Sequence, residues 1–339
     1  MNKTKVETAL LNIKENQYAR WSYANRARNS NTKLGSNRIN ERFVKPLIEP
    51  KFTVPAKAKI FAIGSCFARE IEISLHKKGK NVVSLLFPLA TNGRDRPRLE
   101  KIKQFKDIHR SELLNRYSMP SMYQEIKNLA DQGSFLDYRL IQETAENNYI
   151  DCHYTPATGE LSLENAKSQR EILTSSLSDA FKEADVFILT FGLNEFWRDL
   201  ETDLIFNTIP SLQFVRNNKD RFVYQEGPLA ELIEYGEKTV ETITKSNCNA
   251  KIIITVSPVP LEYTFMSKDI VMQNLKAKNA LHAVANHLAD INKNVDYFPS
   301  YEMVTMSKES IVWKEDRRHI QFDFVNKIMD YALEKYFID

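Results

Sequence analysis

Short apolar runs alternate along this chain with longer stretches in which apolar residues recur every three or four positions. The length and β-branched content of the runs predict buried strands at residues 59–64, 82–87, 186–190, 251–256 and 295–298. The recurring pattern predicts helices at residues 66–78, around 173–184, and at 229–246, 274–291 and 324–336. Because strands that alternate with helices pair in parallel through right-handed crossovers, the pattern predicts an α/β fold with a mostly parallel sheet.

Two parts of the chain depart from this alternation. Residues 1–54 predict a helix, a connector rich in Asn, Ser and Arg, and a proline-stiffened entry to the first strand. We expect this arm to pack on a single domain formed by residues 55–339. Residues 98–148 are charged, rich in Leu, Tyr and Gln, and lack strand-like runs, which favours a helical insertion with helices around 121–130 and 138–145.

The composition is typical of a soluble globular protein, with 42% hydrophobic and 27% charged residues among 339. A net charge of +3 gives no reason to expect a nucleic-acid partner. Residues 1–50 nevertheless carry ten Lys or Arg against four Glu and no Asp. Two interpretations remain open, a contact for a polyanion or charged substrate and an arm with solvated basic groups, and we favour the second because the charges are dilute.

Several functional classes lack support in the sequence. Three widely spaced cysteines predict neither a disulfide framework nor a zinc knuckle, and we expect no metal. No stretch approaches 18 consecutive apolar residues and the first residues lack a signal-peptide core, so we expect a cytoplasmic protein without a membrane span. With nine glycines and no glycine-rich loop, a nucleotide-binding fingerprint is not expected.

Three distant segments carry the residues of a nucleophilic site. Ser65 lies between a predicted strand and a predicted helix, where open α/β sheets bind ligands. Asn194 follows the strand at 186–190, and its side-chain amide could donate to an oxyanion. Asp316 precedes His319 by three residues, a spacing that lets the carboxylate orient the imidazole while the other ring nitrogen serves the serine. Together they predict acyl transfer with Ser65 as nucleophile.

Each of these residues also has a purely structural interpretation. Ser65 could be only an N-cap, Asn194 a turn residue and His319 a surface residue. Cys66 is an alternative nucleophile, although a residue just inside a helix is expected to pack under the turn. His153 beside Cys152 could form a second site, but we favour a satisfied loop histidine. Three further side chains near the site segments could contact substrate or belong to core and rim: Trp197, Arg198 and Trp313.

The order of these motifs resembles the SGNH (GDSL-like) hydrolase superfamily. Residues 64–68, Gly-Ser-Cys-Phe-Ala, spell the motif that names the GSCFA family, and segments 189–192, 255–259 and 297–302 resemble that family's other blocks. The resemblance covers roughly residues 55–335. It implies a three-layer α/β/α, flavodoxin-like domain. It also implies Ser65, Asp316 and His319 as catalytic residues and an oxyanion hole formed by the Ser65 amide, Asn194 and a second-block glycine. That glycine has no clear match; Gly93 is the candidate, and Asn92 could donate instead.

The resulting expectation is an O-acyltransferase that moves an acyl group, with acetyl favoured, to a polysaccharide or sugar precursor. The carbohydrate acceptor is implied by the resemblance, and acyl-CoA is a candidate donor with no permanently bound cofactor. Two alternatives stay open. One is a carbohydrate esterase, and the other is a non-catalytic module that binds carbohydrate or protein.

Overall fold

The computed structural model describes residues 4–22, 32–85, 114–131, 137–145, 147–154, 160–209 and 212–338. Within these ranges the helices are α1 (Val6–Glu15), α2 (Gly35–Arg38), α3 (Cys66–Lys77), α5 (Met119–Ala130), α6 (Leu163–Glu183), α7 (Leu212–Asn217), α8 (Leu229–Ser246), α9 (Ile270–Ile291), α10 (Ser300–Met306), α11 (Glu309–Val312) and α12 (Phe322–Tyr336). A 3₁₀ turn, η3, spans Tyr138–Leu140. The strands are β1 (Val54–Pro55), β2 (Lys59–Gly64), β3 (Asn81–Val82), β4 (Ile141–Ala145), β5 (Asn148–Asp151), β6 (Val186–Phe191), β7 (Glu195–Asp199), β8 (Ile205–Phe206), β9 (Phe222–Glu226), β10 (Lys251–Val256), β11 (Val295–Tyr297) and β12 (Phe337–Ile338).

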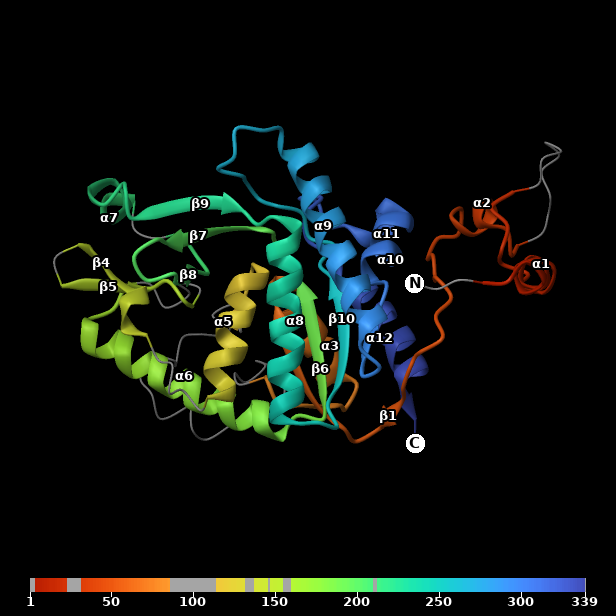
Figure 1. Cartoon of the computed structure of the whole chain (residues 1–339), viewed down its shortest axis with the longest axis horizontal. Coiled ribbons are helices and arrows are strands. Elements are labelled where there is room, and N and C mark those ends of the chain that lie inside the picture. The colour runs from red at the N-terminus through yellow and green to blue at the C-terminus, as the bar shows by residue number, and fades with distance from the viewer. Residues whose placement is uncertain are drawn as a thin grey trace.

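The central sheet is parallel throughout and has the spatial order β11-β10-β6-β2-β3. Numbered by their order along the chain, its strands run 2-1-3-4-5, the flavodoxin-like order. The strands are added in one direction before β6 and in the opposite direction from β6 on, so the topological switch point lies between β2 and β6. Ligands in such folds bind at the carboxyl ends of the two strands that flank this point. Figure 1 shows β6 and β10 directed toward the end of the molecule that carries β7 and β9. The predicted α/β fold with a mostly parallel sheet is confirmed.

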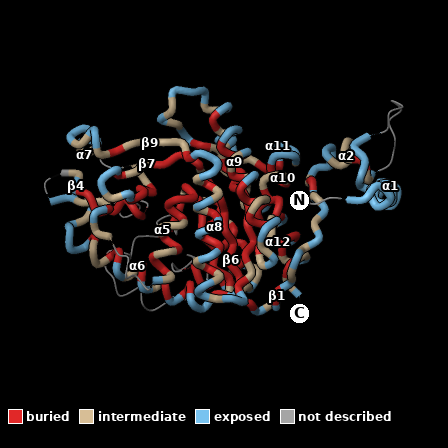
Figure 2. The backbone as a smooth tube through the Cα atoms, in the orientation of Figure 1, coloured by how far each residue is buried: buried red, intermediate tan, exposed pale blue. Residues whose placement is uncertain are grey.

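Helices cover both faces of this sheet and bury a core on each. Alternate side chains of a strand point to opposite faces. Phe61, Phe187 and Ile252 face α5, α6, α8 and α9, whereas Ile60, Val186 and Ile253 face α3, α10 and α12. Figure 2 shows this central part of the molecule as buried. Burying one such side chain contributes roughly 1.5–3 kcal/mol, so the two cores fix the strand register that positions the loops.

The predicted helical insertion at 98–148 is wrong in its second half. Helix α5 confirms the helix expected around 121–130, but residues 138–145 form η3 and β4, and β4 pairs antiparallel with β5. Asn147 between the two strands has φ of 60°, a left-handed conformation that asparagine tolerates, and this permits the tight reversal. Residues 98–113 lie outside the described ranges, as does the end of the strand predicted at 82–87.

A second, antiparallel sheet was not predicted from the sequence. Its order is β8-β7-β9, with Trp197 opposite both Phe206 and Tyr224. It follows β6 after a short turn and lies beyond the carboxyl end of the parallel sheet (Figure 1). It therefore forms a wall over the end of the sheet where a ligand is expected.

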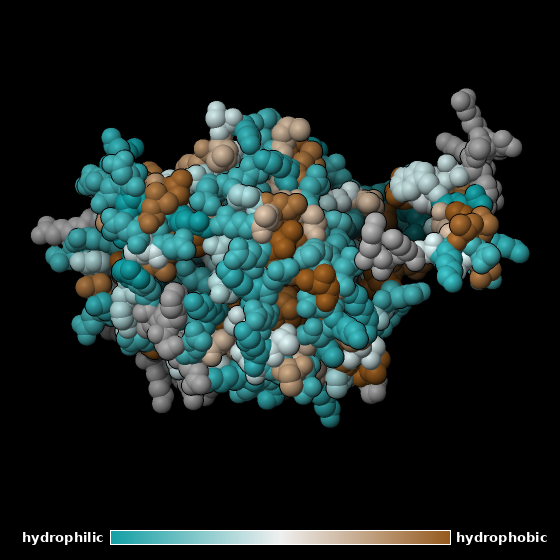
Figure 3. Space-filling view, viewed as in Figure 1, coloured by the Kyte–Doolittle hydropathy of each residue, from teal (hydrophilic) through white to brown (hydrophobic). Residues whose placement is uncertain are grey.

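The N-terminal arm has two parts. Helix α1 has no buried residue and lies apart from the sheet and its helices (Figure 1). Figure 3 shows apolar side chains on this projecting arm, where Val6 and Leu10 are exposed. Further along, the Phe43 ring packs edge-on against Phe324 with centroids 5.2 Å apart, and β1 pairs with β12. No helix in the described ranges is long and apolar enough to cross a membrane.

Candidate functional site

Ser65 lies at the carboxyl end of β2, where the strand turns sharply into α3. Gly64 has φ of 152°, and a Cβ at this position would meet the Thr190 carbonyl oxygen at 2.4 Å, so the turn requires glycine. Ser65 is the N-cap residue of α3, but its side chain makes no capping hydrogen bond. Its hydroxyl instead donates to the Ser257 hydroxyl at 3.1 Å, from the loop that follows β10. The serine is thus directed away from its own helix and toward neighbouring loops.

Gly192 lies against Ser65 across the switch point. A Cβ on Gly192 would meet the Tyr117 carbonyl oxygen at 2.6 Å, the Ser65 Cβ at 3.2 Å and the Ser65 Oγ at 3.6 Å. The segment before α5 is fixed here too, because Arg116 N–H donates to the Gly64 carbonyl at 2.7 Å and Leu193 N–H donates to Tyr117 at 2.7 Å. The lack of a side chain at Gly192 therefore lets its backbone lie close to the Ser65 side chain.

A cavity of about 310 Å³ opens over these residues. Ser65, Cys66, Gly192 and Ser257 line it at the end of the sheet, and Arg318 contributes from the loop before α12. Seven of the other lining residues are aromatic: Tyr117, Phe196, Trp197, Phe206, Tyr224, Tyr263 and Phe265. A concave, mostly apolar cavity with a few convergent polar groups is the usual form of a small-molecule site. A larger hollow of about 420 Å³ between α8 and the end of α9 lies at the opposite end of the sheet and is lined by none of these residues.

The aromatic wall is held by the second sheet and a buried carboxylate. The Trp197 ring centroid lies 5.1 Å from Tyr224 and 5.5 Å from Phe265. The Tyr224 hydroxyl donates to buried Glu195 at 2.5 Å, and the Thr264 hydroxyl donates to the same carboxylate at 2.9 Å. The Trp197 Nε1 is buried and has no hydrogen-bond partner in the described parts of the chain. The wall thus presents aromatic side chains to the cavity, and the indole N–H stays buried behind it.

Of the three side chains expected near a substrate, Trp197 alone lines the cavity. Arg198 does not line it and instead pairs with Glu231 and donates to the Tyr235 hydroxyl. Trp313 pairs with Ile320 through an isolated bridge and packs against the core beneath α3 and α12. Side chains alternate between the two faces of β7, so Trp197 and Arg198 point to opposite faces and only Trp197 reaches the cavity.

Asp316 and His319 form the expected pair on the loop between α11 and α12. The His319 Nδ1 lies 2.6 Å from an Asp316 carboxylate oxygen, and the other oxygen accepts from the His319 backbone N–H at 2.9 Å. These hydrogen bonds hold the pKa of Asp316 well below its usual range. The arrangement leaves Nε2 as the ring nitrogen available to a substrate or nucleophile.

The loop that carries this pair reaches the cavity, but neither Asp316 nor His319 lines it. Arg318, adjacent in sequence to His319, lines the cavity and pairs with Glu262 at 3.1 Å. His319 Nε2 has no hydrogen-bond partner among the residues described, and Ser65 is bonded to Ser257 and not to His319. Ser65 and His319 are therefore not hydrogen-bonded to each other in this arrangement.

Asn194 does not line the cavity. Its side chain is buried and its Nδ2 donates to Glu226 of β9 at 3.1 Å, because Asn194 directly precedes β7, which pairs with β9. The other expected donors, Gly93 and Asn92, lie outside the described residues. Within the described ranges, the backbone N–H groups of Ser65 and Gly192 have no hydrogen-bond acceptor. These two amides, at the N-terminus of α3 and the end of β6, are placed to favour negative charge.

Lys278 is the residue of this site that the sequence analysis missed. It lies on α9, is 1% exposed, and its ammonium donates to the Gly192 carbonyl at 2.9 Å. Burial lowers the pKa of Lys278 to about 7. The signal was present, because Lys278 continues the buried stripe of Leu281, Ala285 and Leu288, where an ionisable group is unusual.

Cys66 is a poor candidate nucleophile in this environment. Burial raises the pKa of the Cys66 thiol, although Arg318 and Lys278 oppose the change. The thiolate is the reactive form of cysteine, so a raised pKa keeps Cys66 unreactive at neutral pH. Between the two adjacent residues, the geometry favours Ser65.

The other histidines have structural partners. His153 is buried and hydrogen-bonded to Glu125, as expected for a satisfied histidine. His282 pairs with Glu302 at 2.8 Å and His287 with Glu237 at 2.9 Å. In the described parts of the chain no group of three or more His, Cys, Asp or Glu side chains could hold a metal ion.

Comparison with family profiles gives a match over most of the chain. The profile of the GSCFA family matches residues 59–331, which includes the Ser65 turn, the end of β6 and the loop with Asp316 and His319. No protein with a curated description matches the chain.

Proposed function

The chain belongs to the GSCFA family, and from the geometry around Ser65 we propose that it is a serine-dependent O-acyltransferase of the SGNH type. The observation that carries the proposal is the position of Ser65. It stands at the N-terminus of α3, at the topological switch of the sheet, on a mostly apolar cavity that the loop carrying Asp316 and His319 reaches through Arg318. Few structural roles need a serine that leaves its own helix uncapped.

In the proposed reaction, rotation of the Ser65 side chain exchanges the Ser257 hydrogen bond for one to His319 Nε2. The Ser65 oxygen attacks the acyl carbonyl of the donor and its proton passes to Nε2, while Asp316 stabilises the imidazolium. The tetrahedral oxyanion is held by the backbone N–H groups of Ser65 and Gly192. As the oxyanion collapses, the donor's leaving group takes the proton from Nε2 and an acyl-serine remains.

The second half of the reaction repeats these steps in reverse. An acceptor hydroxyl gives its proton to His319 and attacks the acyl carbonyl, and Ser65 leaves with the proton returned to its oxygen. We propose a carbohydrate as acceptor. The support is the wall formed by Trp197, Tyr224 and Phe265, because aromatic side chains that line a cavity suit a ring with apolar faces.

Turnover of p-nitrophenyl acetate tests the proposal, measured with and without added oligosaccharides. We expect slow release of p-nitrophenol that accelerates with a suitable acceptor and is lost in Ser65→Ala and His319→Ala. Ser246→Ala, at the exposed end of α8, is the matched control and should leave the rate unchanged. Turnover that no acceptor accelerates would assign an esterase instead, and a folded protein without turnover or covalent labelling would assign a binding module.

A further inference from the structure

Lys278 is a buried ammonium without a counterion. No carboxylate in the described parts of the chain pairs with it, and its hydrogen bond is to the neutral Gly192 carbonyl. An unpaired buried charge destabilises a fold by several kcal/mol, so proteins rarely keep one without a use for it. A methionine or leucine would fill the same place on the stripe of α9.

The position of the ammonium relates it directly to the candidate nucleophile. Lys278 holds the Gly192 carbonyl, and Gly192 is the residue pressed against Ser65. Adding the length of the Lys278–Gly192 hydrogen bond, the bonds within Gly192 and the contact with Ser65 places the ammonium within roughly 10 Å of the Ser65 oxygen. The ionisable group that interacts electrostatically with Lys278 is the Cys66 thiol at the start of α3. The thiol also interacts with Arg318 and Glu70.

We propose that Lys278 is a positioning residue of this site, which holds the Gly192 peptide against Ser65 and supplies the positive charge opposite the developing oxyanion. The inference rests on the proposed function, because the oxyanion is the counterion that the buried ammonium lacks. At roughly 10 Å and an effective dielectric constant of about 20, two unit charges interact strongly enough to change a rate about tenfold or more. Losing the hold on Gly192 adds to this loss.

The inference predicts an unusual pH profile. The ammonium is lost as pH rises through about 7, the pKa to which burial lowers Lys278. The rate constant for acylation of the free enzyme should therefore fall above this pH, because kcat/KM follows the protonation state of free enzyme groups. A role in packing alone produces no such decrease.

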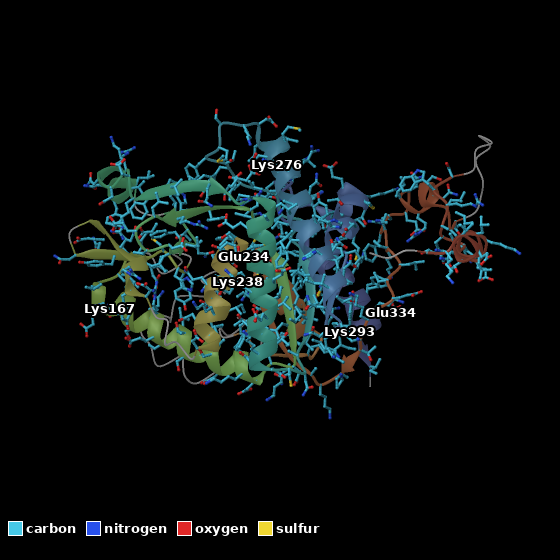
Figure 4. All side chains as sticks on the ribbon, viewed as in Figure 1. Lys167, Glu234, Lys238, Lys276, Lys293 and Glu334 are labelled. Atoms are coloured by element: carbon cyan, nitrogen blue, oxygen red, sulfur yellow. The ribbon has the colours of Figure 1, made fainter. Side chains whose placement is uncertain are left out.

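The test is the second-order rate of Ser65 labelling by a fluorophosphonate between pH 6 and about pH 9.5. In the wild type we expect a decline centred near pH 7. In Lys278→Met we expect a rate about 10- to 100-fold lower at pH 6.5, with the alkaline decline removed. Lys238→Met, which loses an exposed lysine paired with Glu234 on α8 (labelled in Figure 4), should keep the wild-type rate and profile.

The possible results separate this inference from the proposed function. Labelling of the wild type whose rate stays level or rises up to pH 9.5 overturns the role of Lys278 while leaving Ser65 as nucleophile, and this result needs no variant to fold. A folded Lys278→Met protein with the wild-type rate and profile overturns it in the same way. A folded wild type that is not labelled at any pH refutes the proposed function, and the inference fails with it.

Discussion

Replacing Gly192 with alanine should separate the folding of this protein from its chemistry. The new methyl group would lie 2.6 Å from the Tyr117 carbonyl oxygen and 3.2 Å from the Ser65 Cβ. The backbone oxygen cannot swing aside, so either the segment before α5 or the Ser65 turn must shift by several tenths of an ångström. Overpacking of this kind costs roughly 1–3 kcal/mol, and a misplacement approaching 1 Å at a reacting group costs about a hundredfold in rate.

The assay is urea unfolding together with the rate of fluorophosphonate labelling. We expect Gly192→Ala to lose roughly 1–3 kcal/mol of unfolding free energy and about two orders of magnitude in labelling rate. Gly79→Ala is the matched control. Gly79 has φ of 78° and open space around its Cβ position, so alanine there should cost roughly 1–2 kcal/mol of strain and leave labelling unchanged. If Gly192→Ala keeps both the wild-type stability and the wild-type rate, the close approach of Gly192 to Ser65 is not needed for reactivity.

Three further changes probe other parts of the account. Asp316→Asn should lower kcat/KM for p-nitrophenyl acetate by about 10²–10⁴-fold with little change in the unfolding temperature, because it removes the acceptor that orients His319; an unchanged kcat/KM would argue against the pair. Between about pH 7 and pH 10 the unfolding free energy of the wild type should increase by up to about 1.4 kcal/mol per pH unit, since the folded state disfavours the charged lysine and the unfolded state does not. Lys278→Met should lack this increase, and equal slopes of unfolding free energy against pH in the two proteins would contradict the buried ammonium. Glu125→Gln should cost about 3–5 kcal/mol of unfolding free energy at pH 7, because it leaves buried Arg116 without the carboxylate 3.2 Å away; a loss below about 1 kcal/mol in urea unfolding would show that the pair contributes little.

The stability lost in Glu125→Gln should disappear in acid, because Glu125 is then protonated in the wild type as well. Burial alone would raise the pKa of Glu125, but Arg116 and His153 outweigh it and lower the value to about 2. The depressed pKa stabilises the folded state at pH values above the ordinary range of glutamate, and that contribution disappears as pH falls toward 2. The difference between the wild type and Glu125→Gln should shrink over that interval.

Most of the parallel sheet could be predicted from the sequence because its strands are buried on both faces. Such strands form continuous apolar runs, as Val186–Phe191 and Lys251–Val256 do, and amphipathic helices separate them. The predicted helix at residues 229–246 matches α8, and β2 has the predicted bounds. The topology then places the residue that follows β2 at the edge of the sheet where ligands bind, which is why Ser65 could be proposed as the nucleophile from the sequence.

The short antiparallel elements could not be predicted in the same way. Strands β4, β7 and β9 mix charged with apolar residues, so neither a run nor a period distinguishes them from loops. Their pairing depends on contacts between distant segments. The helix predicted at residues 138–145 is wrong for this reason, because the pairing with β5 decides the conformation of β4.

The candidate site was predictable where a local motif carries the chemistry and not where tertiary contacts do. A spacing of three positions from Asp316 to His319 is enough for their hydrogen bond. Whether Asn194 faces the cavity depends on where the chain enters β7, and the partnership of Lys278 with Gly192 joins positions 86 apart in the sequence. The predicted roles of Asn92 and Gly93 lie outside the described residues and stay predictions.

Mass spectrometry of the fluorophosphonate adduct tests the central claim most directly. The tryptic peptide formed by residues 60–69 contains a single serine, Ser65, next to Cys66, and fragmentation distinguishes the two. We predict one adduct per chain, on the Ser65 oxygen, that is absent from Ser65→Ala. An adduct on Cys66, or a folded protein that leaves this peptide unmodified while active serine hydrolases in the same tube react, would contradict the account.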